Sequence, residues 1–175
     1  SQRGSFGDIA ASSFGGMVYY TSPDRSSLLE QLQNQSIKAI CDADWKDLLI
    51  EHLPELPDFT LLVGWTGQVA ITDSLIQATE KKRKVATDSA FYKEFLAKSH
   101  AIVQGLQSAW NQKNIPTLQE GIRANRALLN EFAKVMQLEI ETPALQTLCA
   151  LAEQNGACAK TSGAGGGDCG ICFTQ

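Results

Sequence analysis

The pattern of apolar and polar positions predicts several helices joined to short strands. Apolar side chains recur on one helical face in two long segments, first at Phe91, Phe95, Ile102, Leu106 and Trp110, and then at Leu118, Ile122, Leu129, Phe132 and Met136. A third amphipathic helix is expected over residues 143–156, because Thr142 can cap it and Pro143 suits the first helical position.

Short runs of strand-favouring residues separate these helices. Residues 17–21 are rich in aromatic and β-branched side chains, and residues 59–63 are nearly all apolar, which predicts a buried strand there. Residues 157–161 and 169–173 flank a glycine-rich loop as two further strands. Strands combined with several helices predict an α+β fold, with an antiparallel sheet covered by helices on one face.

Three less regular segments are also expected to be helical. Asp8 can cap a short helix over residues 9–14, and apolar spacing predicts another over residues 45–53. A third begins near residue 72 and ends in the basic run at 81–84, which we interpret as a solvated helix end.

Composition and charge narrow the class of protein. The chain has 175 residues, of which 43% are hydrophobic and 19% charged, enough for one domain or a little more. Its net charge of −4 argues against a nucleic-acid partner. No apolar run approaches the roughly 20 residues needed to cross a bilayer, and residues 1–10 lack the pattern of a secretory signal, so we expect a cytoplasmic protein without a membrane partner. Five cysteines in mostly apolar context predict reduced thiols rather than a disulfide framework.

The stretch KTSGAGGGDCGICF, residues 160–173, is the most distinctive motif. The P-loop pattern is absent, and a GxGxxG match is followed by a strand rather than by the helix that a dinucleotide site needs. Cys169 and Cys172 resemble half of a zinc site, but His52 and His100 lie far away in the sequence. Side chains three apart in a strand also point to opposite faces, so we favour core packing and no metal.

Backbone anion binding remains as a function for this loop. Consecutive glycines can turn successive N–H groups into one concavity, and Ser162 can add a hydroxyl donor. The alternative is a flexible hairpin loop, although so many glycines are costly to order. Asp8 can be interpreted as the cap of a helix or as a catalytic residue, and the two roles are compatible. Trp65–Gly67 follows a strand, where ligand-binding loops occur, although a lone tryptophan more often packs.

Three segments together resemble the GHMP small-molecule kinases. KTSGAGGGDCG resembles the family's third signature motif, GSFGDIAAS the segment with its catalytic aspartate, and FTLLVGWTG the branch whose acceptor is itself a phosphate group. The resemblance implies a two-domain α+β fold. Residues 1–57 would be the end of an N-terminal catalytic domain, similar to ribosomal protein S5 domain 2, with a linker. Residues 58–175 would be a ferredoxin-like C-terminal domain, trimmed at its end.

The resemblance also implies an activity and a set of site residues. The expected reaction moves the γ-phosphoryl group of ATP, with Mg²⁺, onto the phosphate of 5-phosphomevalonate in isoprenoid biosynthesis. Asp8 would be the catalytic residue, acting mainly by orienting a lysine and organising the site. The expected substrate-binding and phosphate-binding residues are Ser162, Gly163, Ala164, Gly165, Trp65 and Thr66.

Parts of the family pattern are missing from this sequence. The proline-led glycine and serine loop and the N-terminal lysine should both lie upstream of Ser1. We therefore expect a C-terminal piece of a longer protein, inactive alone and dependent on its missing N-terminal half. Mevalonate kinase or another GHMP kinase is the alternative within the family, and a non-catalytic metabolite-sensing or interaction module is the alternative outside it. A homodimer is left open.

Overall fold

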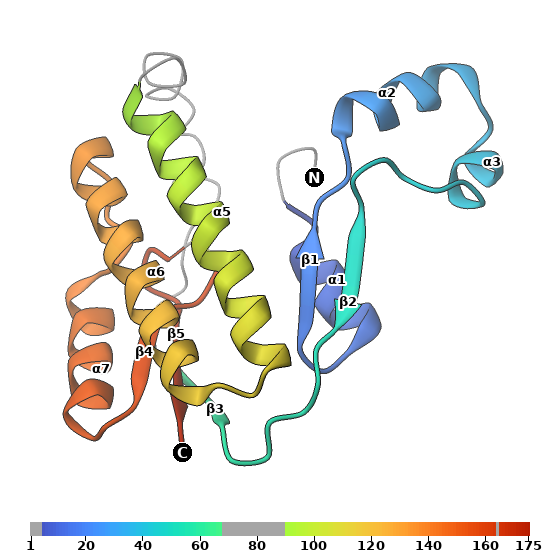
Figure 1. Cartoon of the computed structure of the whole chain (residues 1–175). Helices are drawn as coiled ribbons and strands as arrows, with labels where there is room; N and C mark the ends of the chain where they lie inside the picture. Colours follow the sequence, from blue (N-terminus) through green and yellow to red (C-terminus); the bar gives the residue numbers. More distant parts are fainter. Residues whose placement is uncertain (1–4, 68–89, 164) are drawn as a thin grey trace. The chain divides into compact units, whose positions relative to one another are not determined.

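The computed structural model describes residues 5–67, 90–163 and 165–175. It contains two compact units, Ser1–Glu55 and Leu56–Gln175, which are described separately (Figure 1). The assignment of the two kinase domains, with a boundary after residue 57, stays a prediction. The helix expected between residues 72 and 84 lies outside the described residues, as does Ala164. Among the helices of the described ranges, none is long and apolar enough to cross a membrane.

The first unit places a two-stranded sheet among three helices. Its elements are α1 (Gly7–Phe14), β1 (Val18–Thr21), α2 (Arg25–Asn34), α3 (Ile37–Cys41) and β2 (Leu49–His52). β1 and β2 are antiparallel, with Val18 opposite His52 and Thr21 opposite Leu49. The strand predicted at residues 17–21 is therefore confirmed. The sequence pattern did not reveal α2 and α3, whose caps are the side chains of Asp24 and Ser36.

The helix predicted over residues 45–53 is wrong, because this segment forms a turn followed by β2. Asp47 has a φ of 66°, a left-handed conformation that interrupts a right-handed helix. The indole Nε1 of Trp45 donates to the carbonyl oxygen of Ile40 at 2.8 Å, which holds the turn against α3. The apolar spacing that suggested a helix serves the turn and a half-buried strand instead.

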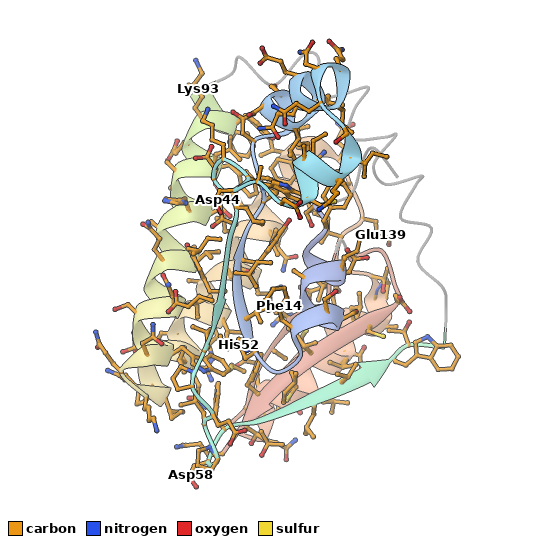
Figure 2. All side chains as sticks on the ribbon, turned by 90° about the vertical axis from the view of Figure 1, so that its right-hand side faces the viewer. Phe14, Asp44, His52, Asp58, Lys93 and Glu139 are labelled. Carbon is orange, nitrogen blue, oxygen red and sulfur yellow. The ribbon has the colours of Figure 1, made fainter. Side chains whose placement is uncertain are left out.

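An apolar groove of about 380 Å³ lies within the first unit. It is lined by α1, by both strands and by the turn before β2, and includes Phe6, Ile9, Phe14, Tyr20, Trp45 and Leu48. At its edge the ring of Phe14 lies 5.9 Å from the ring of His52; Figure 2 labels both residues. This unit therefore has apolar side chains that its own residues leave partly uncovered.

The second unit contains a three-stranded sheet and three described helices. Its elements are β3 (Thr60–Trp65), α5 (Ala90–Asn111), α6 (Ile115–Met136), α7 (Pro143–Gln154), β4 (Cys158–Thr161) and β5 (Cys169–Thr174). The strand order is β3-β5-β4, and both pairings are antiparallel. The three amphipathic helices are confirmed, and Thr142 caps α7 as expected. The predicted α+β class with an antiparallel sheet is also confirmed.

Helices cover the sheet through close contacts with glycine. Gly64 of β3 lies opposite Gly170 of β5, and the side chain of Leu148 in α7 occupies the space where a Cβ at either glycine would stand. At the other end of the sheet, Phe173 stacks on Phe59 with 5.1 Å between ring centroids. Figure 1 shows α5 and α6 side by side, with α7 next to β4.

β3 is an edge strand, and the prediction that it is buried is wrong. Leu61, Leu62 and Val63 are 44%, 51% and 62% exposed. In the described part of the chain β3 pairs on one side only, with β5. The apolar run at residues 59–63 therefore correctly predicted a strand but did not correctly predict its burial.

Candidate functional site

The glycine loop joins β4 to β5 and has backbone angles that glycine favours. Gly163, Gly165, Gly166 and Gly167 have φ values of 55°, 75°, 85° and 121°. Other residues adopt such angles only at a cost, so the glycines set the path of the loop. Gly163 is exposed and Ser162 half-buried, whereas Gly165 and Gly167 are buried.

Several amides of the loop already donate hydrogen bonds inside the protein. The N–H of Ser162 donates to the carbonyl of Cys169 at 2.9 Å, and the N–H of Gly165 to the carbonyl of Ser162 at 3.2 Å. The N–H of Gly166 donates to the carbonyl of Ile140 at 2.8 Å. Among the predicted phosphate-binding residues 162–165, the amides of Ser162 and Gly165 are therefore used in internal bonds. The described donors of the predicted anion nest are narrowed to the Gly163 N–H and the Ser162 hydroxyl.

Thr66, predicted from the end of β3, contacts the glycine loop directly. Its N–H donates to the carbonyl of Asp168 at 3.0 Å, and its hydroxyl is 2.9 Å from the same oxygen. The hydroxyl also contacts the carbonyl oxygen of Gly167. Trp65 pairs with Cys169 in the sheet and leaves 67% of its surface exposed. The structure therefore brings Trp65 and Thr66 together with the loop.

A segment that sequence reasoning missed supports the other side of the loop. A Cβ at Gly165 would collide with the carbonyl oxygen of Ile140, and one at Gly167 would lie 3.5 Å from the methyl group of Thr142. Because Thr142 caps α7, the loop lies at the N-terminus of that helix, where the helix dipole favours negative charge. A backbone carbonyl gives no sequence signal, so Ile140 could not have been found in advance.

Between these two residues, Glu141 is held by a buried ion pair. Its carboxylate accepts from Arg126 Nε at 2.9 Å and from Asn130 Nδ2 at 2.8 Å. The side chain of Glu141 is only 4% exposed. Hydrogen bonding from Arg126, and to a lesser degree from Asn130, lowers the pKa of Glu141 despite the opposing effect of burial. The sequence analysis did not identify this network, because Arg126, Asn130 and Glu141 belong to no recognisable motif.

Lys160 contributes a cation at the base of the loop. Its amine donates to the carbonyl of Thr161 at 2.9 Å, and burial lowers the pKa of this half-buried lysine. Burial lowers the pKa because it disfavours the charged ammonium form relative to the neutral amine.

The cysteines of the motif lie in β5, as predicted. Cys169 and Cys172 are both half-buried, and burial raises the pKa of each thiol. Cys158 of β4 is fully buried, and burial raises its pKa to about 11. In the described ranges, no group of three His, Cys, Asp or Glu side chains could hold a metal ion.

Asp8 lies in the first turn of α1 and is exposed, but it is not the helix cap. Phe6 occupies the cap position with a φ of 64°, so the predicted capping role of Asp8 is wrong. An acid in the first turn still interacts favourably with the helix dipole. Because Asp8 belongs to the first unit and the loop to the second, their proximity in a catalytic site stays a prediction.

Comparisons with known proteins place this geometry in context. Residues 102–175 match the family model described as GHMP kinases C terminal. A phosphomevalonate kinase from Streptomyces sp. (strain CL190) is 37% identical over 169 residues, which are 97% of this chain and 45% of that protein.

Two solved structures are similar to this chain over nearly its whole length. The Lin0012 protein from Listeria innocua has a TM-score of 0.92 and 35% identity, over 98% of this chain and 48% of its own. The phosphomevalonate kinase from Streptococcus pneumoniae, in complex with phosphomevalonate and AMPPNP, has a TM-score of 0.82 and 29% identity over the same shares. The chain thus spans about half the length of these relatives.

Proposed function

Residues 102–175 belong to the GHMP kinase family as its C-terminal domain, and from this premise we propose that the chain is part of a phosphomevalonate kinase. The family predicted from the sequence motifs is confirmed. In the proposed reaction, the intact protein transfers the γ-phosphoryl group of ATP to 5-phosphomevalonate. The proposal includes a cytoplasmic location and a requirement for the remaining part of the protein.

The internal anchoring of the glycine loop is the observation that best supports this proposal. The loop is held by Ile140 on one side and by Thr66 on the other, and Gly163 remains exposed between them. In our proposal, this anchoring restricts the movement of the Gly163 amide and the Ser162 hydroxyl in the same loop. Fixed N–H and O–H donors stabilise phosphate oxygens without having to be ordered when the substrate binds.

The chemistry of the acceptor defines the proposed role of Asp8. A phosphate monoester has a second pKa of about 6, so the nucleophilic oxygen is already ionised at neutral pH. We therefore assign Asp8 to orienting the family's lysine, with proton abstraction secondary. Phosphoryl transfer depends mainly on positioning and on neutralising the charge of two anions. Mg²⁺ would supply part of that neutralisation, and the exposed carboxylate of Asp8 is the kind of oxygen ligand that Mg²⁺ accepts.

The direct test is an assay of the full-length protein with three acceptor conditions. We expect ADP release with ATP and 5-phosphomevalonate, and background release with mevalonate or with no acceptor. Activity with mevalonate alone would instead identify the alternative kinase. Binding of phosphomevalonate by calorimetry without any ADP release would support a metabolite sensor.

Substitutions in the full-length protein test the assigned residues. Asp8→Asn should lower turnover less than loss of the upstream lysine, whereas a larger loss for Asp8→Asn would support a general base. Asp44→Asn is the matched control, because Asp44 is another exposed acid of the first unit and should leave turnover unchanged. Ser162→Ala should raise the KM for phosphomevalonate about tenfold, the effect of one lost hydrogen bond to a charged group.

A further inference from the structure

We propose that Arg126 and Glu141 are positioning residues for the glycine loop, acting through the backbone of residues 140–142. The effect on catalysis rests on the proposed kinase function, whereas the effect on the loop does not. Neither residue contacts the loop through its side chain in the bonds described above. Their influence is carried by the peptide group that joins Ile140 to Glu141.

That peptide group supports the loop on the side opposite Thr66. Its carbonyl oxygen, belonging to Ile140, accepts the N–H of Gly166 at 2.8 Å. The same oxygen borders Gly165 so closely that no Cβ fits between them. Any rotation of this peptide would therefore break the bond to Gly166 and press on Gly165.

Glu141 resists such a rotation, because hydrogen bonds hold both its side-chain carboxylate and its backbone carbonyl. Arg126 and Asn130 of α6 bind its carboxylate, and Gln146 of α7 donates to its carbonyl oxygen at 3.2 Å. Ile140, the preceding residue, packs in a core cluster with Phe132, Ala133 and Met136. Contacts with both α6 and α7 therefore hold residues 140–141 in place. We expect these contacts to restrict the movement of the glycine loop as well.

A second ion pair, which joins α6 to α7 itself, provides the control. Arg123 of α6 binds Glu153 of α7 at 2.8 Å and also donates to the carbonyl of Ala157. Glu153 lies near the C-terminal end of α7, at the opposite end from Thr142 and the glycine loop. Glu141→Gln and Glu153→Gln therefore make the same chemical change in two pairs that differ in their connection to the loop.

The first measurement is amide hydrogen exchange in the full-length protein, without substrate. We expect Glu141→Gln to speed exchange of the Gly166 amide at least tenfold, as the support of its hydrogen bond loosens. Glu153→Gln should leave this amide within about twofold of the wild-type rate. Unchanged exchange at Gly166 in Glu141→Gln, or equal acceleration in both variants, would overturn the proposal.

The second measurement is steady-state kinetics at a temperature where every variant is folded by circular dichroism. Glu141→Gln should raise the KM for phosphomevalonate about tenfold and change kcat less, since the lost interaction concerns phosphate binding. Leu118→Val, in the core at the other end of α6, should lower stability and leave the KM unchanged. An equal KM increase in Leu118→Val would reduce the effect to general destabilisation and overturn the proposal.

Two further variants keep the test decisive if Glu141→Gln fails to fold. Asn130→Ala removes one bond to Glu141 and should shift Gly166 exchange and the KM in the same direction by a smaller factor. Arg126 binds Glu141 through both Nε and Nη2, and Arg126→Lys keeps the charge but not this paired geometry, so it should give an intermediate result. If no variant or wild-type protein phosphorylates phosphomevalonate, the proposed function fails, and the exchange data still decide whether Glu141 positions the loop.

Discussion

At the scale of single residues, two glycines of the same loop have left-handed backbone angles for different reasons. Gly163 has a φ of 55° and open space where a Cβ would stand. Gly165 has a φ of 75°, and the backbone of Ile140 occupies the Cβ position. A side chain at Gly163 would meet only the intrinsic cost of the angle, whereas one at Gly165 would also displace the loop from its support.

This difference predicts unequal costs for the same substitution. Gly163→Ala should lower the free energy of unfolding by about 1 kcal/mol, the usual penalty for a left-handed alanine. Gly165→Ala should cost at least about 3 kcal/mol, because a backbone carbonyl cannot move aside as a flexible side chain can. Urea unfolding of both variants measures the comparison. Equal costs would mean that the loop is not seated against Ile140.

At the scale of elements, the sequence predicted the long helices of the second unit, and in the first unit it predicted α1 and β1 but not α2, α3 or β2. Amphipathic spacing identified α5 and α6, and a proline after a capping threonine located α7. The helix predicted over residues 45–53 was wrong, because apolar spacing alone cannot detect the left-handed conformation of Asp47 or the pairing of β2 with β1. Tertiary pairing outweighs local propensity in such short segments.

The candidate site shows the same division. The path of the glycine loop was predictable because left-handed backbone angles favour glycine. Thr66 and Trp65 were predicted from their place after a strand and from the family resemblance, and their role in binding stays a prediction. The loop's support at Ile140 and the Arg126–Glu141 pair were not, since a backbone carbonyl has no residue preference and the two charges are 15 positions apart. The relation of Asp8 to the loop stays a prediction.

The ion pair between α6 and the segment before α7 predicts a pH dependence of stability. Hydrogen bonding from Arg126 lowers the pKa of Glu141 in the folded state below its usual value of 4.5. The stabilisation is therefore complete above the unfolded value and is lost as the pH falls through the lowered folded value. At pH 7, Glu141→Gln should lower the free energy of unfolding by about 3 kcal/mol, as expected for a broken buried pair.

The measurement is urea unfolding of wild type and Glu141→Gln at several pH values from neutral to acid. The difference between the two proteins should narrow once the pH falls below about 4.5. A difference that stays constant with pH would show that the carboxylate charge contributes nothing to stability.

At the scale of the whole molecule, apolar burial is divided unevenly between the two units. Among the described residues, the buried apolar side chains of the first unit are Ala10, Pro23 and Ile40, whereas the second unit contains Trp110, Leu118, Leu145 and many others. The first unit also contains the open apolar groove that α1 helps to line. A unit of this size with so small a core has little to offset its conformational entropy.

We therefore expect the two units to behave differently when produced separately. Residues 56–175 should unfold in one cooperative thermal transition followed by circular dichroism. Residues 1–55 should unfold without a sharp transition and should bind a hydrophobic dye. A cooperative transition in residues 1–55 alone would show that the groove does not limit the stability of the first unit.

The side chain of Leu148, which fills the space next to Gly64 and Gly170, limits which substitutions these positions can accept one at a time. Alanine at Gly170 would place its Cβ 2.8 Å from Leu148, so this step alone should reduce stability. Shortening Leu148 first would leave a void, and that step is also unfavourable. The two changes together should be better tolerated than either alone, which thermal unfolding of G170A, L148A and the double variant would measure. These positions are therefore expected to change as a group, with second-site suppressors of Gly170 variants arising at Leu148.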